Sequence, residues 1–293
     1  MPNAQLDVAS YRVGILCALS HERAAVEAAL DEEHEWPKDY NEDDGNVYSF
    51  GKIGEHNVVI ASLPEVRLLV GIGGGVPSKQ HDIRLGDVVF SQPSGDHGGV
   101  IYALSALKAR HGNPKRSKVG EHLAKITEEL SERYGYQGAE NDDLFPPDYA
   151  HVAGSEPCHN TNPFRRCDIK RHIKREVRSN PGSPRLHYGN IASGDEVIKN
   201  GLERDRIASG LGALCFEMEA AGLEDSFPCL VVRGICDYSD SHKNKDWQRY
   251  AAATAAAFAR EFLSFVRVQT ADDPTSKQRG QAHFGHVFNF GTS

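Results

Sequence analysis

The stretch LLVGIGGGVPS, residues 68–78, sets four glycines directly after a run of strand-forming residues, and Lys79 follows it. A phosphate-binding P-loop requires Gly-Lys-Ser/Thr, whereas Val76, Pro77 and Ser78 separate the last glycine from Lys79. A dinucleotide-binding fingerprint requires a third glycine where Val76 stands, followed by a helix. Both motifs fit poorly, so the glycines mark a different kind of site.

We interpret the glycines as the floor of a ligand site at the carboxyl end of a buried strand. Ligands bind at such strand ends in open α/β sheets. Glycine has no side chain, so a ligand can approach the backbone closely. Gly73 and Gly74 are therefore candidate substrate contacts.

Buried strands and helices alternate along the rest of the chain. We expect strands at 11–17, 86–92 and 229–236, and helices at 117–135 and from about 247 to 268. This alternation is typical of an α/β fold. It predicts a three-layer α/β/α domain around a mostly parallel mixed sheet.

The same pattern suggests how the chain is divided. Residues 1–10 are expected to form a flexible N-terminal arm, and 11–268 a single domain, in which the Pro- and Asn-rich segment 138–185 is a loop excursion. The tail 269–293 has no helical period, which favours disorder. Its HFGHVFNFG segment also permits a second interpretation, an assembly-prone strand.

Composition excludes several classes of protein. The formal net charge is −8, which argues against a nucleic-acid partner. No stretch is apolar enough for a membrane span, and the N-terminus lacks the features of a signal peptide, so we expect a cytoplasmic protein without a membrane partner. Cys158 and Cys167 are spaced too widely for a usual zinc site, and no metal is predicted.

Acidic residues follow three other predicted strands or lie at the start of the next helix. They are Glu22, Glu217, Glu219 and Asp237. The carboxyl ends of parallel strands meet at one edge of a sheet, where a buried acid is costly unless it is used or paired. Each acid alone can be explained as a helix cap or a satisfied ion pair. Together with the glycine floor, they indicate a site for acid–base chemistry.

Several motifs occur in the order found in the nucleoside phosphorylase superfamily, which the chain resembles over residues 11–268. They are G-x-x-x-A-x-x-x-E (14–22), GIGGG with LGDVV after it, SGDEVI, FEMEAAG and VVRGICDYSD. The likeness is closer to the nucleosidase branch, which includes methylthioadenosine/S-adenosylhomocysteine nucleosidase. It is closest to the phosphorylase-like N-terminal domains of fungal NOD-like receptor proteins. The resemblance implies the superfamily's fold, a purine nucleoside or nucleotide as substrate, no cofactor and a homo-oligomer.

The resemblance also implies roles for individual residues. Asp237 would protonate purine N7, and Glu22 would position or activate the attacking water. An acid that assists the leaving group suits a bond whose cleavage passes through an oxocarbenium-like state. Glu219, with Met218 beside it, would hold the ribose hydroxyls. Further substrate contacts implied by the matching motifs are Glu217, Val197 and Ile198.

Hydrolysis is favoured over phosphorolysis. Phosphorylases of this superfamily commonly carry an arginine before the glycines and a Ser/Thr within them, where this chain has Leu69 and Ile72. Lys243 and Lys245 are candidate contacts for substrate phosphates, although lysines in such a segment are more often simply solvated.

Two segments that the superfamily carries are missing here. HNVVIASLP (56–64) runs almost directly into the glycine strand, although a parallel crossover needs roughly a dozen or more residues. A second shortening follows HGGV (97–100). The alternatives to a hydrolase are therefore a non-catalytic nucleoside-sensing or signalling module of an immune-type receptor, and a phosphate-dependent phosphorylase.

Overall fold

The computed structural model describes residues 5–40, 48–60, 66–92, 98–113, 116–152, 167–220, 230–266 and 287–289. Its strands are β1 (Val13–Leu16), β2 (Glu32–His34), β3 (Ser49–Ile53), β4 (His56–Ile60), β5 (Val66–Gly75), β6 (Val88–Phe90), β7 (Leu186–Tyr188), β8 (Asn190–Ser193), β9 (Ala213–Glu217), β10 (Leu230–Asp237) and β11 (Val287–Asn289). Its α-helices are α1 (Ser20–Glu27), α2 (Gly98–His111), α3 (Val119–Glu129), α4 (Gly201–Leu211) and α5 (Gln248–Leu263). Short 3-10 helices lie at Val8–Ser10, Glu132–Tyr134, Ala139–Asn141 and Ile169–Arg171.

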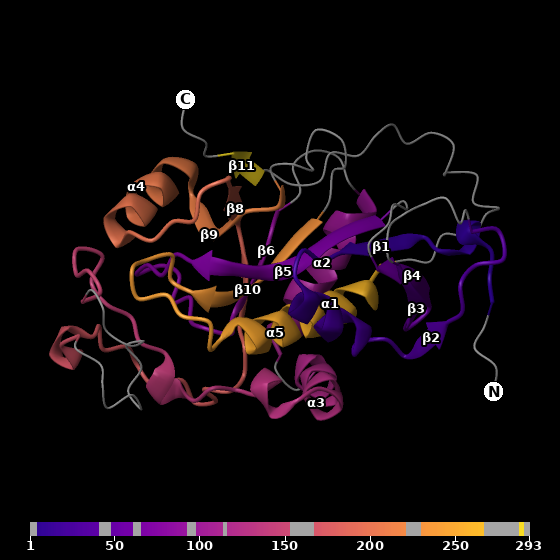
Figure 1. Ribbon diagram of the computed structural model, residues 1–293, viewed down its shortest axis with the longest axis horizontal. Helices are drawn as coiled ribbons and strands as arrows, with labels where there is room; N and C mark the ends of the chain where they lie inside the picture. Colours follow the sequence, from indigo (N-terminus) through magenta and orange to yellow (C-terminus); the bar gives the residue numbers. More distant parts are fainter. Residues whose placement is uncertain are drawn as a thin grey trace.

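The described strands form one mixed sheet, and β5 is at its centre (Figure 1). β5 runs parallel to β1 and β10, and β1 runs parallel to β4. β8 and β9 are also parallel to each other, whereas β9 meets the end of β5 in an antiparallel direction. The sheet is therefore mostly parallel with antiparallel additions, as the sequence predicts.

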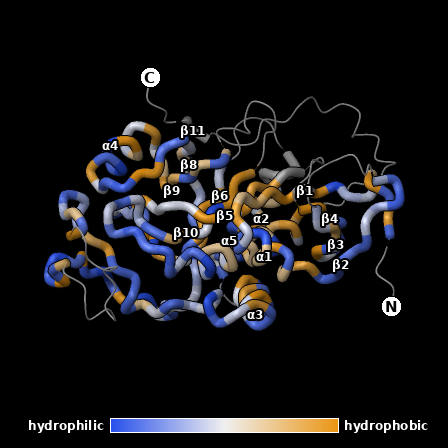
Figure 2. Tube along the Cα trace, in the orientation of Figure 1, coloured by the Kyte–Doolittle hydropathy of each residue, from blue (hydrophilic) through white to orange (hydrophobic). Residues whose placement is uncertain are grey.

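Helices cover the sheet on both sides. Alternate residues of β5 explain this: Leu68 and Val70 pack under α1, α2, α3 and α5, whereas Leu69 faces a second core shared with β6, β8, β9 and β10. On the far side α4 packs on β8 and β9. Hydrophobic residues accordingly concentrate on the central strands and on the faces of the helices that cover them (Figure 2). The expected three-layer α/β/α arrangement is confirmed.

The alanine-rich helix α5 lies closest to the sheet. Almost every residue from Tyr250 to Leu263 is buried, and a Cβ on Gly234 of β10 would collide with the backbone of Ala251. Small residues on both elements permit this close approach. α5 thereby fixes the position of β10, whose last residue is Asp237.

Two helices end earlier than the sequence predicts. The C-terminal helix, expected to reach about 268, is α5 and ends at Leu263. The expected helix 117–135 is α3, which ends at Glu129, and Leu130 is extended. Tyr134 belongs to a separate 3-10 turn, although its ring is still buried in the same core. The apolar spacing continues beyond Glu129 because α3 and the 3-10 turn at Glu132–Tyr134 both pack against α5.

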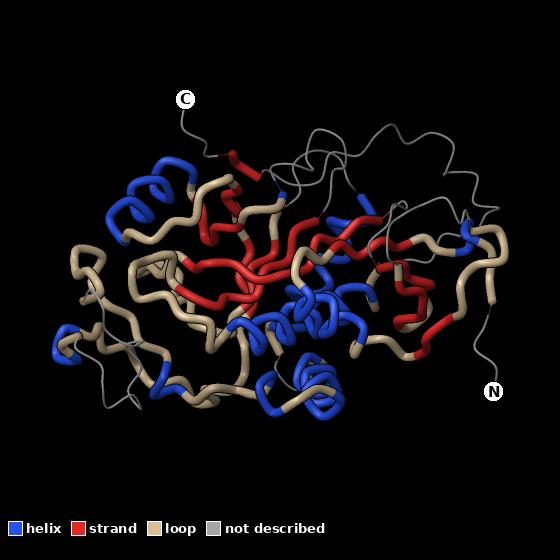
Figure 3. Tube along the Cα trace, in the orientation of Figure 1, coloured by secondary structure: helices blue, strands red, loops and turns tan. Residues whose placement is uncertain are grey.

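The excursion 138–185 is held to the sheet by buried ion pairs, and Figure 3 shows its described parts as loop and short helical turns. Asp87, next to β6, accepts hydrogen bonds from both terminal nitrogens of Arg178 at 2.7 Å and from His187 at 3.0 Å. Arg175 pairs with Asp142 at 2.8 Å within the excursion and donates to the backbone carbonyl of Ile83, ahead of β6, at 3.1 Å. The basic run 170–178 thus includes two anchoring arginines.

The shortened connection after β4 is visible in the topology. β4 and β5 lie on opposite sides of β1 and both run parallel to it, and residues 61–65, which separate them in the sequence, lie outside the described residues. The second shortening precedes α2, which begins at Gly98. Val287–Asn289 of the tail pairs with β8 in a parallel register.

Candidate active site

The candidate site lies where two strands divide along one edge of β5. β1 pairs with β5 as far as Leu69, and β9 pairs with it only from Gly74. Between these positions no described strand pairs with this edge of β5. A divergence of neighbouring strands at a carboxyl end is where open α/β sheets bind ligands.

The glycines belong to β5 itself, so the strand continues through the stretch that the sequence analysis places at its carboxyl end. They give room to charged side chains of the protein. A Cβ on Gly71 would lie 2.6 Å from Glu22 Oε1 and would collide with Arg233, whereas one on Gly74 would lie 2.7 Å from Asp237 Oδ1. Glu22 and Arg233 therefore lie beside one end of the strip and Asp237 beside the other, and Gly71 and Gly74 are about 10 Å apart along the strand.

Glu22 supplies a hydrogen-bond acceptor to the edge of β5 between its pairing with β1 and its pairing with β9. It is 2% exposed, and its Oε2 accepts hydrogen bonds from the backbone N–H groups of Ala18 (3.0 Å) and Leu19 (2.9 Å). Its Oε1 accepts one from Ile72 N–H of β5 at 2.8 Å. Glu22 thus caps α1, as the structural explanation predicts, and also binds β5 at the edge where no described strand pairs with it.

Arg233 lies beside Glu22 and was not singled out from the sequence. Its side chain is fully buried and its Nη2 contacts Glu217 Oε2 closely and Glu219 Oε2 at 3.0 Å. Its Nε and Nη1 have no hydrogen-bond partner among the described residues. A buried guanidinium with free donors beside a carboxylate is suited to hold a small polar molecule. The signal was available, because an arginine in the apolar run CLVVRGIC must be paired.

Glu217 and Glu219 share this arginine unequally. Glu217 is 4% exposed and also accepts hydrogen bonds from the backbone of Glu219 and Ala220. Burial raises its pKa, but Arg233 and a hydrogen bond from Ser193 outweigh burial and hold it below its usual range. Burial, together with the charge of Glu217, raises the pKa of Glu219. Glu217 therefore anchors Arg233, while Glu219 is partly exposed.

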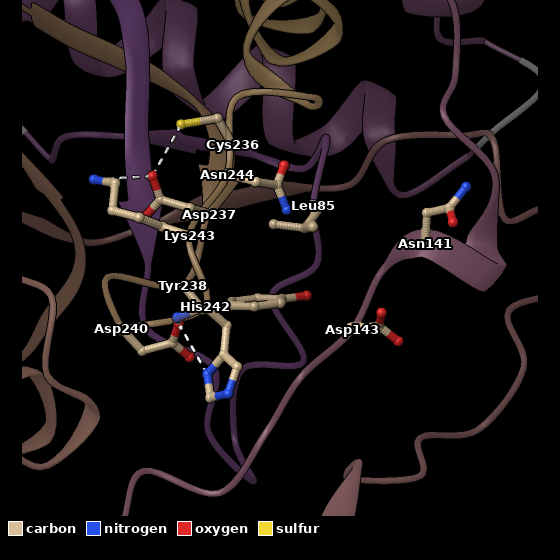
Figure 4. Close-up of a pocket in the computed structure, with 10 residues that line it drawn as sticks. All are labelled: Leu85, Asn141, Asp143, Cys236, Asp237, Tyr238, Asp240, His242, Lys243 and Asn244. Carbon is tan, nitrogen blue, oxygen red and sulfur yellow. Dashed lines mark hydrogen bonds and ion pairs between the residues drawn. The ribbon is translucent and has the colours of Figure 1, made fainter. Parts of the chain in front are cut away.

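Asp237 ends β10 at the other end of the strip (Figure 4). Its Oδ1 accepts the backbone N–H of Ser239 at 2.8 Å, and its Oδ2 lies 3.3 Å from Lys243 Nζ and 3.4 Å from Cys236 Sγ. Ser239 has φ of 50°, a strained conformation for a residue with a side chain, of the kind that clusters at functional sites. The tight turn after Asp237 therefore fixes its carboxylate and brings Lys243 back to it.

A depression of about 350 Å³, partly open to solvent, adjoins Asp237. Its lining is mostly polar and comes from the turn after β10 and from the excursion; it comprises Leu85, Asn141, Asp143, Cys236, Asp237, Tyr238, Asp240, His242, Lys243 and Asn244. Figure 4 shows Lys243 and Cys236 converging on Asp237 at one end of this depression. Solvent therefore reaches the neighbourhood of the acid.

The other predicted contacts lie around this core of the site. Met218 and Val197 are 44% and 43% exposed, so both are accessible to a ligand. Ile198 instead packs with α4 and β9 in a separate apolar cluster. Lys245 is exposed, and Gly73 lies under Cys215, which a Cβ on Gly73 would approach to 2.6 Å.

No group of acidic, histidine or cysteine side chains within the described ranges is arranged to hold a metal ion. Cys158, one of the two cysteines considered for zinc, lies outside those ranges. Across the same described ranges, the helices are too short or too polar to cross a membrane.

Comparisons with known proteins support the resemblance stated above. No protein-family model matches the sequence. A nucleotide-binding leucine-rich repeat (NLR)-like protein of Hyaloscypha variabilis is 37% identical over 305 residues, which cover 88% of this chain but only 30% of that protein. A 5'-methylthioadenosine/S-adenosylhomocysteine nucleosidase of Mycobacterium bovis is 31% identical over 93 residues, 30% of this chain and 36% of the enzyme. The chain thus spans about a third of the length of these curated relatives.

Among solved structures, a protein of Borrelia burgdorferi B31 with adenine bound, provisionally named as a nucleosidase of the same type, superposes with a TM-score of 0.50. The match covers 86% of this chain and 99% of that one at 12% identity, so it speaks for the fold. The chain therefore has the nucleoside phosphorylase-type fold of the methylthioadenosine/S-adenosylhomocysteine nucleosidases, and its sequence relates it to a fungal NLR-like protein.

Proposed function

We propose that the chain hydrolyses the N-glycosidic bond of a purine nucleoside or adenine nucleotide and releases the free base. The observation that carries this proposal is the pair at one end of the glycine strip, where two buried donors of Arg233 have no partner within the described part of the chain and lie beside the Glu22 carboxylate. A water molecule held there would accept from one of the free Arg233 donors and donate to Glu22 Oε1, which orients it for attack.

The other end of the strip supplies the acid. Breaking the glycosidic bond leaves negative charge on the purine, and a proton delivered to N7 by Asp237 neutralises it. Asp237 lies beside Gly74, about three residues along β5 from the water site, a spacing that the base and ribose of one nucleoside would bridge. Glu219, at the mouth of the site with Met218, would accept hydrogen bonds from the ribose hydroxyls.

Water rather than phosphate is the nucleophile in this proposal. Leu69 is buried in the core with 2% exposure, and the N–H of Ile72 is already bonded to Glu22. Neither residue offers a donor to phosphate, and two acids beside Arg233 would repel it. If the substrate is a nucleotide, the exposed Lys245 is a candidate contact for its phosphates.

A second candidate function is a nucleoside-sensing module. It is favoured by the NLR-like relative, of which this chain covers only 30%. It is also favoured by the short sequence, five residues, that separates β4 from β5, two strands that both run parallel to β1. In that case adenine or a nucleoside would bind at the same strip without turnover.

Incubation of the purified protein with ATP, AMP, adenosine and inosine, with and without inorganic phosphate, distinguishes these functions by chromatography. The hydrolase releases free base without phosphate, and Asp237→Asn loses this activity while the exposed-site control Asp246→Asn keeps it. Base released only with phosphate would identify a phosphorylase. No base from any substrate, with adenine still raising the thermal unfolding temperature, would identify the sensing module.

A further inference from the structure

We propose, on the basis of the proposed hydrolysis, that Lys243 is the proton source for the leaving base and works through Asp237 as a two-residue relay. The two groups face each other, with 3.3 Å between Lys243 Nζ and Asp237 Oδ2. From the sequence Lys243 was a candidate contact for a substrate phosphate, and its position against the acid suggests a different role.

The described groups that contact the Asp237 carboxylate are all hydrogen-bond donors. Oδ1 accepts a backbone N–H, and Oδ2 faces an ammonium group and a thiol. An ionised carboxylate accepts hydrogen bonds and has no proton to give. Asp237 can act as an acid in this arrangement only if a proton reaches it during the reaction, and the nearest group that carries one is Lys243.

Lys243 is placed to regain a proton from solvent. Its side chain is 30% exposed, and it lines the depression that opens to solvent beside Asp237. Asp237 itself is 6% exposed, so solvent reaches it less readily than it reaches the lysine. The other titratable groups that line the depression are Asp143, Cys236, Tyr238, Asp240 and His242. Asp240 and His242 face each other at 3.7 Å, and Tyr238 donates to Asp142.

The C1'–N9 bond breaks with its electron pair remaining on the purine, while water oxygen bonds to C1' and gives a proton to Glu22. Asp237 Oδ2 first takes a proton from Lys243 Nζ, and the protonated Asp237 then delivers that proton to purine N7 as the bond breaks. Lys243 is left as a neutral amine and takes a proton from solvent after the base departs, and the proton on Glu22 returns to solvent.

The test uses two substrates that differ only in their need for an acid. Adenosine needs protonation at N7, whereas 7-methyladenosine already carries a methyl group and positive charge there and leaves as a neutral base. Lys243→Met is expected to lower kcat/KM for adenosine by about 100-fold or more, the usual size of a general-acid contribution. Cleavage of 7-methyladenosine by the same variant stays unchanged. The exposed lysine control Lys174→Met leaves both substrates unaffected.

Lys243→Arg separates a relay from a charge effect. Arginine keeps the positive charge but does not release a proton in proteins. The relay predicts that Lys243→Arg loses adenosine cleavage as Lys243→Met does. Wild-type adenosine activity in Lys243→Arg, or equal losses with both substrates in Lys243→Met, would overturn the relay alone. A wild-type protein that releases base from neither nucleoside would overturn the proposed hydrolysis together with the relay.

Discussion

Glu22 Oε1 accepts a hydrogen bond from Ile72 N–H at 2.8 Å and so joins the first turn of α1 to the unpaired edge of the glycine strand, fifty positions further along the chain. The same carboxylate caps α1 through Ala18 and Leu19. One side chain therefore satisfies three backbone donors at the point where the sheet divides. Its structural role and its proposed role in catalysis can be measured separately in one variant.

Glu22→Gln is expected to lower both stability and turnover. The amide offers one acceptor oxygen, and its NH₂ group would face a backbone donor, so the free energy of unfolding should fall by about 1–2 kcal/mol. Base release should fall by a larger factor, about 100-fold or more, because water would lose its base. Urea unfolding and a chromatographic assay measure the two effects. A variant as stable as wild type would contradict the bonding pattern described here.

Gly71→Ala is expected to disrupt the charged cluster. The added Cβ would collide with Arg233 and lie 2.6 Å from Glu22 Oε1, and such overpacking costs about 1–3 kcal/mol. Gly210→Ala in α4 is the matched control, because its Cβ meets no atom within 4 Å and removal of a helical glycine stabilises by about 0.5–1 kcal/mol. The unfolding midpoint should fall in Gly71→Ala and rise in Gly210→Ala. A fall in both variants would contradict the explanation by steric overlap.

Arg233→Met is expected to leave Glu217 and Glu219 without their cation and to lower stability by about 3–5 kcal/mol near neutral pH. Without the guanidinium, burial raises the pKa of these carboxyls above the unfolded values. A raised pKa contributes stability at low pH that is lost as pH rises, so the variant should be more stable at about pH 5 than at about pH 8. The double variant Glu217→Gln/Arg233→Met should recover part of the loss. Urea midpoints at both pH values provide the comparison, and a pH-independent loss would count against this reasoning.

Asp87→Asn should release the excursion from the sheet. Burial raises the pKa of Asp87, but hydrogen bonds from Arg178 and His187 outweigh burial and lower it. A depressed carboxyl pKa contributes stability that is present above its unfolded value of about 3.9 and is lost as pH falls through the folded value. We therefore expect a loss of about 3–5 kcal/mol at neutral pH and a smaller difference from wild type in acid. Thermal unfolding followed from neutral to acidic pH tests this, and a constant difference would disagree with it.

The sequence predicted the layers of the fold well because its signals were local. Apolar runs such as CLVVRGIC (229–236) identified buried strands, and the acids after them fell beside the glycines because parallel strands end at a common edge. Asp237 and Glu22 lie at the two ends of the glycine strip in the structure. Their chemical roles stay predictions.

The contacts that depend on distant residues could not be read from the sequence. Arg178 is bonded to Asp87, ninety-one positions away, and nothing local distinguishes it from the solvated basic residues around it. The strand character of Gly71 and its neighbours was also missed, because glycine normally weakens a strand. Here a neighbouring strand on one side and Glu22 on the other hold the backbone extended.

Two cysteines, Cys215 and Cys236, lie beside the glycine strip, and their chemical labelling can report on this part of the structure. Burial raises the pKa of the Cys215 and Cys236 thiols well above the usual range, so neither is a thiolate at neutral pH and neither will be labelled by alkylating reagents while the sheet is closed. The rate of labelling at these two positions, followed by peptide mass spectrometry, then measures how often the sheet opens where β1 and β9 diverge along β5. A nucleoside or adenine that binds beside these cysteines will slow their labelling, whether or not it is cleaved.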